Sequence, residues 1–231
     1  MSGIAQSAKA GSIRIPVLAY CVAEQQTLID SLGTGVEGAP VRWIDAGGLR
    51  CFVSDFAAQM PYAPVPEMVK AFNQVLQRIF AQAVIIPFRF PTIVESEDSL
   101  RQFVEGRAAE YREALKRLRN KVQMDVLISF KIPDNVKGSS LQSGRSYLEG
   151  RRGCYQKAQS VMDEFRRVSN SLAERWIQRD TSSGIRGFAL VDRSSLAVFL
   201  EKIGTVVTPA DISARLTGPW PPSEFVEITS E

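Results

Sequence analysis

The chain offers few side chains that could carry out catalysis, and its 231 residues include no histidine at all. Histidine supplies the base of Ser-His-Asp triads, the helix ligands of H-E-x-x-H zinc sites and the commonest proton carrier near neutral pH. The sequence also contains no G-x-S-x-G elbow, no P-loop and no paired acidic motif. A carboxylate, a lysine or a cysteine could still react, but these absences predict a protein that is not an enzyme and has no cofactor.

The three cysteines, Cys21, Cys51 and Cys154, are widely spaced and form no C-x-x-C pair. This spacing favours buried free thiols over a disulfide framework or a zinc site. Free thiols are typical of a reducing compartment. We therefore expect no metal and a cytoplasmic protein.

Two segments resemble nucleotide- or RNA-binding motifs, and both fail on context. Gly33–Gly38 fits G-x-G-x-x-G, but it precedes an expected strand instead of opening a helix, as a phosphate-binding loop must. Cys51–Phe56 resembles the aromatic strand of RNA-binding sheets, but Ser54 separates Phe52 from Phe56 where aromatics should alternate. The net charge of +3 is also too balanced to indicate nucleic acid or an anionic membrane as a partner.

Composition places the chain among ordinary globular proteins, with 45% hydrophobic and 23% charged residues. A chain of this length buries roughly 70 to 75% of its unfolded surface, so it needs no disulfide or metal for stability. The longest apolar stretch, Phe80–Phe90, is interrupted by Gln82, Pro87 and Arg89 and is too short to cross a bilayer. Residues 1–12 lack the apolar core of a signal peptide and are expected to form a disordered tail.

Hydrophobic periodicity predicts an α+β protein of two domains. For the first domain, residues 13–92, it indicates the order β-α-β-β-α-β, which suits a ferredoxin-like sheet with both helices on one face. The expected strands are Ile13–Val22, Val41–Ala46, Leu49–Phe56 and Val84–Phe90, and the expected helices are Gln25–Ser31 and Pro66–Phe80.

The second domain, residues 96–231, is expected to be an α/β unit with long helices. Ser96 is a suitable N-cap for one helix that extends to about Leu118. The remaining pattern predicts strands at Val122–Ile132, Gly184–Asp192 and Ser213–Thr217 and helices at Arg145–Gln178 and Ser194–Ile203.

The helix expected at Arg145–Gln178 would be roughly 50 Å long, which is more than a compact domain of this size needs. Its basic side chains can form a solvated face or a docking surface. Phe88 and Arg89 lie in the last expected strand of the first domain, where we expect Arg89 to pair with a carboxylate. The basic residues of the helix are Arg145, Arg151, Arg152, Lys157, Arg166, Arg167, Arg175 and Arg179.

The segment Leu216–Phe225 reads Leu-Thr-Gly-Pro-Trp-Pro-Pro-Ser-Glu-Phe. Proline fixes φ and removes a hydrogen-bond donor, so this segment is expected to leave the fold as a stiff, extended arm. Trp220 is expected to pack into the core as an anchor, and a surface role for the P-x-x-P spacing is the alternative.

The string Thr217–Pro222 resembles the "TGPWPP" ending of the gas vesicle accessory proteins of the F and L type. Gly48–Ser54, Ile86–Thr92 and Gly144–Leu148 resemble other segments of that family in the same order. Ser223 and Glu224 stand where the family usually has Tyr and Ser, Pro91 stands where it usually has Gly, and the chain has no His, as in a divergent member.

This resemblance implies a non-enzymatic accessory protein that is cytoplasmic, associates with gas vesicles and binds the small hydrophobic shell protein as adaptor, nucleator or minor structural component. Other gas vesicle accessory proteins are further possible partners. The alternative is a ferredoxin-like protein that binds RNA or a small ligand, which rests on fold analogy alone. The candidate partner-binding residues are Phe88, Arg89, Arg145, Arg151, Arg152, Trp220 and Glu224.

Overall fold

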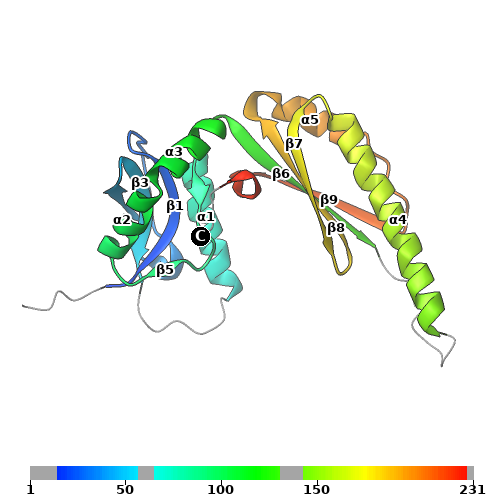
Figure 1. Cartoon of the computed structure of the whole chain (residues 1–231), viewed down its shortest axis with the longest axis horizontal. Coiled ribbons are helices and arrows are strands. Elements are labelled where there is room, and N and C mark those ends of the chain that lie inside the picture. Colours follow the sequence, from blue (N-terminus) through cyan, green and yellow to red (C-terminus); the bar gives the residue numbers. More distant parts are fainter. Residues whose placement is uncertain (1–14, 57–64, 131–142, 228–231) are drawn as a thin grey trace, which may run out of the picture. The chain divides into compact units, whose positions relative to one another are not determined.

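The computed structural model describes residues 15–56, 65–130 and 143–227, with the backbone alone at 143–147. The tail expected at residues 1–12 lies outside these ranges. The chain divides into two compact units, residues 1–83 with 87–112 and residues 84–86 with 113–231. Each unit contains one sheet with helices packed on it (Figure 1), so the predicted α+β class is confirmed.

The first unit contains a sheet with the strand order β2-β3-β1-β4, in which β5 also pairs with β1. The central strand β1 is buried from Val17 to Ala23, so both faces of the sheet are covered at this strand. The strands are β1 (Val17–Glu24), β2 (Arg42–Ala46), β3 (Leu49–Asp55), β4 (Ile86–Pro87) and β5 (Ile93–Val94).

Strands β2 and β3 form the hairpin that the sequence predicts. Gly47 and Gly48 make its two-residue turn with φ of 56° and 74°, values that suit a type I′ turn and that glycine adopts without steric cost. The strand expected at Val84–Phe90 is much shorter, because only Ile86–Pro87 pairs with the sheet.

The helix expected at Gln25–Ser31 is absent, and this expectation was wrong. Only a short 3₁₀ turn, η1 (Val36–Gly38), lies between β1 and β2. The backbone N–H of Val36 donates a hydrogen bond to Tyr20 Oη (3.0 Å), and a methyl group at Gly35 would overlap this oxygen. Packing against β1 therefore stabilises a loop here, and the first unit lacks one helix of the ferredoxin-like order.

The helix expected at Pro66–Phe80 is confirmed as α1, and its Phe72 ring stacks on Tyr20 with centroids 5.1 Å apart. The single helix expected from Ser96 to Leu118 is instead two helices, α2 (Glu97–Gly106) and α3 (Ala108–Arg117). Arg107 interrupts them with φ −120° and ψ 15°. The short break follows Gly106, a poor helix former.

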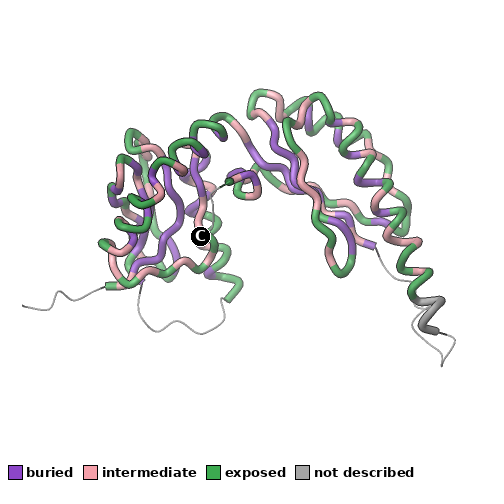
Figure 2. Tube along the Cα trace, viewed as in Figure 1, coloured by how far each residue is buried: buried purple, intermediate pink, exposed green. Residues whose placement is uncertain are grey.

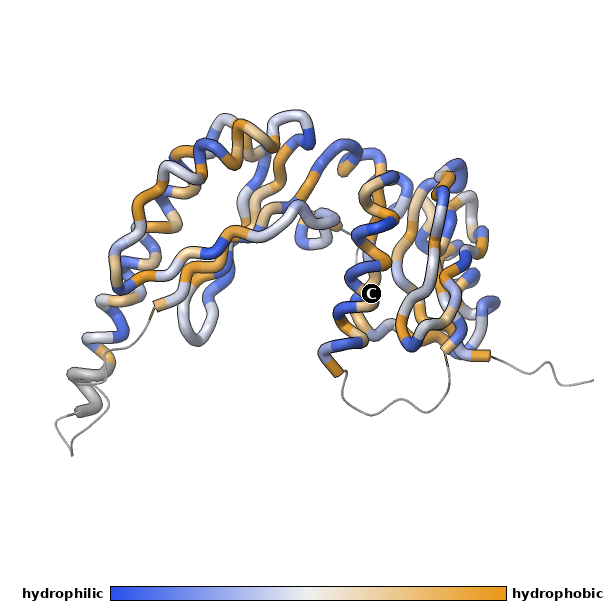
Figure 3. The backbone as a smooth tube through the Cα atoms, turned by 180° about the vertical axis from the view of Figure 1, so that it is seen from behind, coloured by the Kyte–Doolittle hydropathy of each residue, from blue (hydrophilic) through white to orange (hydrophobic). Residues whose placement is uncertain are grey.

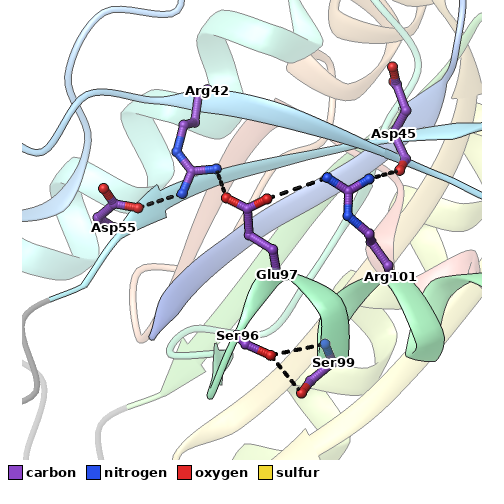
Figure 4. A network of polar contacts seen from close by, with 7 residues as sticks. All are labelled: Arg42, Asp45, Asp55, Ser96, Glu97, Ser99 and Arg101. Atoms are coloured by element: carbon purple, nitrogen blue, oxygen red, sulfur yellow. Dashed lines mark hydrogen bonds and ion pairs between the residues drawn. The ribbon is translucent and has the colours of Figure 1, made fainter. Parts of the chain in front are cut away.

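Polar contacts hold α2 against the β2–β3 hairpin (Figure 4). The Ser96 side chain accepts a hydrogen bond from the backbone N–H of Ser99 (3.2 Å), which confirms the predicted N-cap. Glu97 pairs with Arg42 at 2.5 Å, and Arg101 donates to the main-chain oxygen of Asp45. These side chains are partly exposed, so each ion pair contributes less than about 1 kcal/mol to stability. The main effect of the cluster is therefore to orient α2 on the hairpin.

The second unit has the order β-α-β-β-α-β and the antiparallel strand order β7-β8-β6-β9. This is the ferredoxin-like arrangement. The first unit, for which the sequence predicted it, has the equivalent strand order β2-β3-β1-β4 but lacks the helix between its first two strands. The elements are β6 (Lys121–Phe130), α4 (Ser143–Ser169), β7 (Ala173–Thr181), β8 (Gly184–Asp192), η3 (Arg193–Ser195), α5 (Leu196–Gly204), β9 (Ile212–Trp220) and η4 (Ser223–Phe225).

Helices α4 and α5 pack against the same face of this sheet (Figure 1). Hydrophobic and hydrophilic residues alternate along α4 (Figure 3), and its buried side chains include Val161, Met162 and Phe165. A methyl group at Gly187 of β8 would lie 2.7 Å from Met162 Sδ, so helix and sheet are in close contact. The two central strands β6 and β8 are the most continuously buried strands of the unit (Figure 2).

The predicted helix Arg145–Gln178 is too long, because α4 ends at Ser169 and β7 begins at Ala173. Arg175 and Arg179, expected on the helix, lie on β7 and pair with Leu190 and Arg186 of β8. Arg175, Ile177 and Arg179 are two residues apart, so all three lie on one face of the strand.

Candidate binding face on the second sheet

The sheet face opposite α4 and α5 is composed of alternate residues of the four strands. The register places Arg179, Arg186, Leu127 and Arg215 side by side, one from each strand in the order β7-β8-β6-β9. We call this set the arginine row. Paired residues of neighbouring strands have Cβ atoms about 4.5 to 5.5 Å apart, so three guanidinium groups share one line across the sheet.

The C-terminal arm, residues 221–227, covers one end of this face. Contrary to expectation, the chain does not leave the sheet before the prolines, because β9 continues to Trp220. Pro219 is tolerated because β9 is an edge strand and its pairing with β6 is irregular between Gln123 and Asp125. Gly218 has φ 131°, and a methyl group there would lie 2.9 Å from the Gln123 carbonyl oxygen.

The core anchor of the arm is Phe225, and the expectation that it would be Trp220 was wrong. Trp220 is only half-buried, and its indole N–H donates to Thr217 Oγ1 (3.3 Å). Phe225 is 1% exposed and packs with Leu118, Phe188 and Leu190. Phe225 is buried because the η4 turn directs its ring onto the apolar part of the sheet. Trp220 instead lies at the end of the edge strand β9.

A polar network joins the arm to the arginine row. Asp125, whose side chain is only 7% exposed, accepts hydrogen bonds from Arg186 (2.5 Å) and from the Gln123 amide (2.8 Å). The Gln123 Oε1 atom in turn accepts from the backbone N–H of Glu224 (3.0 Å), and Glu224 pairs with Arg179 at 2.5 Å. A buried carboxylate needs such partners, so this network stabilises both the arm and the row.

Glu227 provides a second contact between the arm and basic residues. Its carboxylate pairs with Arg175 (2.7 Å) and with Arg117 (3.0 Å). The hydrogen bond from Arg175, together with the charges of Arg117 and Arg175, lowers the pKa of Glu227 below its ordinary value. The arm thus carries two carboxylates on either side of a buried aromatic ring, each bound to arginine.

The guanidinium groups of Arg179 and Arg186 also lie over the Phe188 ring, at 5.4 and 4.9 Å from its centroid. Arg175 lies 5.9 Å from the Phe225 centroid. Such cation–π contacts contribute about 0.5 to 1 kcal/mol at exposed sites and restrict the arginine side chains.

The structure distributes the predicted partner-binding residues over three places. Trp220 lies at the end of β9 and Glu224 lies on the arm that follows it, whereas Arg151 and Arg152 are exposed on α4, on the other side of the sheet. Arg145 also lies in α4, but its side chain is outside the described residues. The last two, Phe88 and Arg89, lie in the first unit, where Phe88 is half-buried and Arg89 is exposed.

Arg89 does not make the carboxylate pair that was expected, because within the described ranges its side chain has no ion-pair partner. Its main-chain oxygen accepts a hydrogen bond from Thr92 Oγ1 (2.6 Å). The short β4 strand ends at Pro87, so Arg89 is not held beside the sheet as the sequence suggested.

Sequence reasoning named Arg179 and Glu224 but missed the other residues of the arginine row and its network, which are Arg186, Arg215, Gln123 and Asp125. Arg175-Trp176-Ile177-Gln178-Arg179 does not alternate polar and apolar residues, and the apolar stripe of the helix before it continues through Leu172 and Trp176, so no local pattern marked the change to a strand. The buried pair Gln123 and Asp125 gave no local signal, since polar residues in an apolar strand are recognised only once their partners are known.

The remaining sequence motifs are structural. Cys21 and Cys51 are buried, and burial raises the pKa of both thiols, that of Cys51 to about 12. Phe52 and Phe56 are buried, so neither ring is available to stack on a base. Over the described residues, no group of three His, Cys, Asp or Glu side chains could hold a metal ion, and no helix is both long and apolar enough to span a bilayer.

Comparisons with known proteins agree with this fold. A curated relative, gas vesicle protein F1 of Halobacterium salinarum, is 26% identical over 214 residues, which cover 90% of this chain and 92% of that relative. The solved structure of gas vesicle protein GvpF from Anabaena sp. PCC7120 has a TM-score of 0.77 at 15% identity and covers 94% of this chain and 98% of that one. GvpF from Microcystis aeruginosa has a TM-score of 0.73 at 15% identity and covers 93% and 100%.

At this identity the two solved structures establish a shared fold. The family model described as "Gas vesicle synthesis protein GvpL/GvpF" matches residues 16–227, which include both units and the C-terminal arm. The chain therefore belongs to the GvpL/GvpF family of gas vesicle synthesis proteins, and its role is that of a gas vesicle accessory protein.

Proposed function

We propose that the chain binds the small hydrophobic shell protein of gas vesicles and acts as an adaptor, nucleator or minor structural component during assembly, without catalysing a reaction. The observation that carries the proposal is the family match over residues 16–227. A cytoplasmic location in association with gas vesicles, and contacts with other accessory proteins, belong to the same proposal.

The physical requirement is a stable scaffold that exposes apolar side chains with charges around them, because an apolar partner aggregates unless it is covered. The first turns of α4 offer such a surface. Leu148 is 64% exposed, and Arg151 and Arg152, three and four residues later, lie on the same side of the helix and are exposed. We assign shell-protein binding to this surface, which contains Arg151 and Arg152, two of the residues proposed from the sequence.

Co-expression of the tagged chain with its host's shell protein tests the proposal. The shell protein is expected to co-purify with the wild-type chain and to be lost from Leu148→Asp and from the double variant Arg151→Ala/Arg152→Ala. Arg166→Ala, which removes an exposed arginine at the other end of α4, is the control and should retain the shell protein.

Flotation provides the cellular readout. Cells that lack the chain should lose gas vesicles and should recover them with the control variant but not with the double variant. Normal flotation without the chain, together with no co-purification, would contradict a role in assembly through the shell protein.

A further inference from the structure

The arginine row is only partly neutralised by the chain itself. Arg186 pairs with the buried Asp125, and Arg179 pairs with Glu224 of the arm. Arg215 is exposed and has no ion-pair partner among the described residues. Like charges aligned across a sheet repel one another, so this row is most stable when a further anion lies on it.

The residues beside the row on the same face of the sheet are small. On this face, the next set of paired residues toward the β7–β8 hairpin is Thr181, Gly184, Ser129 and Ser213. These side chains are small, and two of the four residues, Gly184 and Ser129, belong to the central strands. The three longer guanidinium groups therefore border a strip of the sheet that carries no bulky side chain.

The arm shows which chemistry this face accepts. Glu224, Phe225 and Glu227 bind it through two carboxylate–arginine contacts and one buried ring. Arginine matches carboxylate geometry and forms charge-assisted hydrogen bonds with it. The arm covers the apolar end of the face and leaves Arg215 free of such a contact in the described chain.

We propose that the arginine row is a docking site for an acidic segment of a partner protein, which adds carboxylates beside Arg215 in the way that the arm adds them at Arg179 and Arg175. This surface lies on the sheet face opposite α4, so it is distinct from the surface assigned to the shell protein. It can therefore fail or succeed independently of that assignment.

Single-stranded RNA is the rival ligand, because Arg186–Val191 reads Arg-Gly-Phe-Ala-Leu-Val and matches most of the aromatic strand motif of RNA-binding sheets. In those proteins the aromatic rings of the motif stack on bases. Here Phe188 is 1% exposed and lies beneath Phe225 and two guanidinium groups. The covered ring favours a protein carboxylate over a base as the occupant.

The test measures binding of a fluorescein-labelled oligoglutamate peptide to the full chain by fluorescence anisotropy, with oligoglutamine and oligouridylate as comparison probes. Arg215→Glu should weaken oligoglutamate binding about tenfold, since it removes one attraction and adds one repulsion. Glu224→Gln frees Arg179 and should tighten binding about threefold. Added salt should weaken binding in every case.

Two matched variants separate a specific site from overall charge. Lys70→Glu makes the same charge change on an exposed position of α1, and Glu201→Gln removes an exposed carboxylate from α5. Both should bind oligoglutamate as the wild type does. The proposal is overturned by an absence of oligoglutamate binding, by an equal loss in Lys70→Glu and Arg215→Glu, or by tighter binding of oligouridylate that follows the same variants.

Discussion

Replacing Phe225 by alanine tests whether the arm is anchored by its phenylalanine. The ring is 1% exposed and packs with Leu118, Phe188 and Leu190, and Val84 and Ile177 are partly buried beside them. Truncation of a buried phenylalanine costs about 3 to 5 kcal/mol, because transfer free energy is lost and a cavity remains. We expect Phe225→Ala to lower the unfolding free energy of the second unit by this amount.

Urea denaturation measures the change, and the reporter must lie in the second unit, because two units can unfold separately. Trp176 and Trp220 lie in that unit, whereas Trp43 lies in the first. A Trp43→Phe background therefore isolates the signal. With a urea slope of about 2 kcal/mol per molar, the midpoint should fall by roughly 2 M.

Trp220→Ala is the matched control, read out through Trp176. Because Trp220 is half-buried, its truncation should cost about 1 kcal/mol, near the average for a point mutation. A larger loss for Trp220→Ala than for Phe225→Ala would refute the assignment of the anchor and restore the expectation drawn from the sequence.

Three further predictions concern other parts of the chain. Gly153→Ala should raise the unfolding free energy by about 0.5 to 1 kcal/mol, because alanine loses less backbone entropy than glycine inside a helix. Gly153 lies inside α4, and a methyl group there meets no atom within 4 Å. The urea midpoint should therefore rise, and a lower midpoint would contradict this placement. Cys51 should react with a disulfide reagent only on unfolding, since burial raises the pKa of its thiol to about 12. The less buried Cys154 should react in the folded protein. Equal reaction rates of the two thiols in the folded protein would contradict the burial of Cys51. Arg175 and Arg117 lower the pKa of Glu227. The stability that this carboxylate provides is therefore present above the ordinary glutamate pKa and is lost as the pH falls through the lowered value. Urea midpoints should show that stability declines more steeply below about pH 5 in the wild type than in Glu227→Gln.

Local patterns predicted the elements whose residues interact mainly with near neighbours. Helix Pro66–Phe80 and strand Gly184–Asp192 were predicted with the bounds that the structure shows. The Gly47-Gly48 turn was also predicted, because a two-residue hairpin demands positive φ at both positions. In each case the periodicity or the turn residue is itself the physical cause of the element.

Elements that depend on distant partners were misjudged. The apolar positions Leu172 and Trp176 continue a helical stripe equally well, yet pairing with β8 makes Ala173–Thr181 a strand. The segment Gln25–Ser31 has the composition of a short helix, but the chain after β1 folds as a loop against Tyr20. Tertiary contacts contribute more free energy than the propensity of so short a segment.

The sequence by itself determined the α+β class, the family and the lack of histidine chemistry, because these depend on residue types and on short strings such as Thr217–Pro222. Only the tertiary structure decided that the second unit also has the ferredoxin-like order, that Phe225 is the anchor and that Arg179, Arg186 and Arg215 share one row. Strand register brings together residues far apart in the chain, and a shift of one position would send each side chain to the other face. No local pattern contains that information.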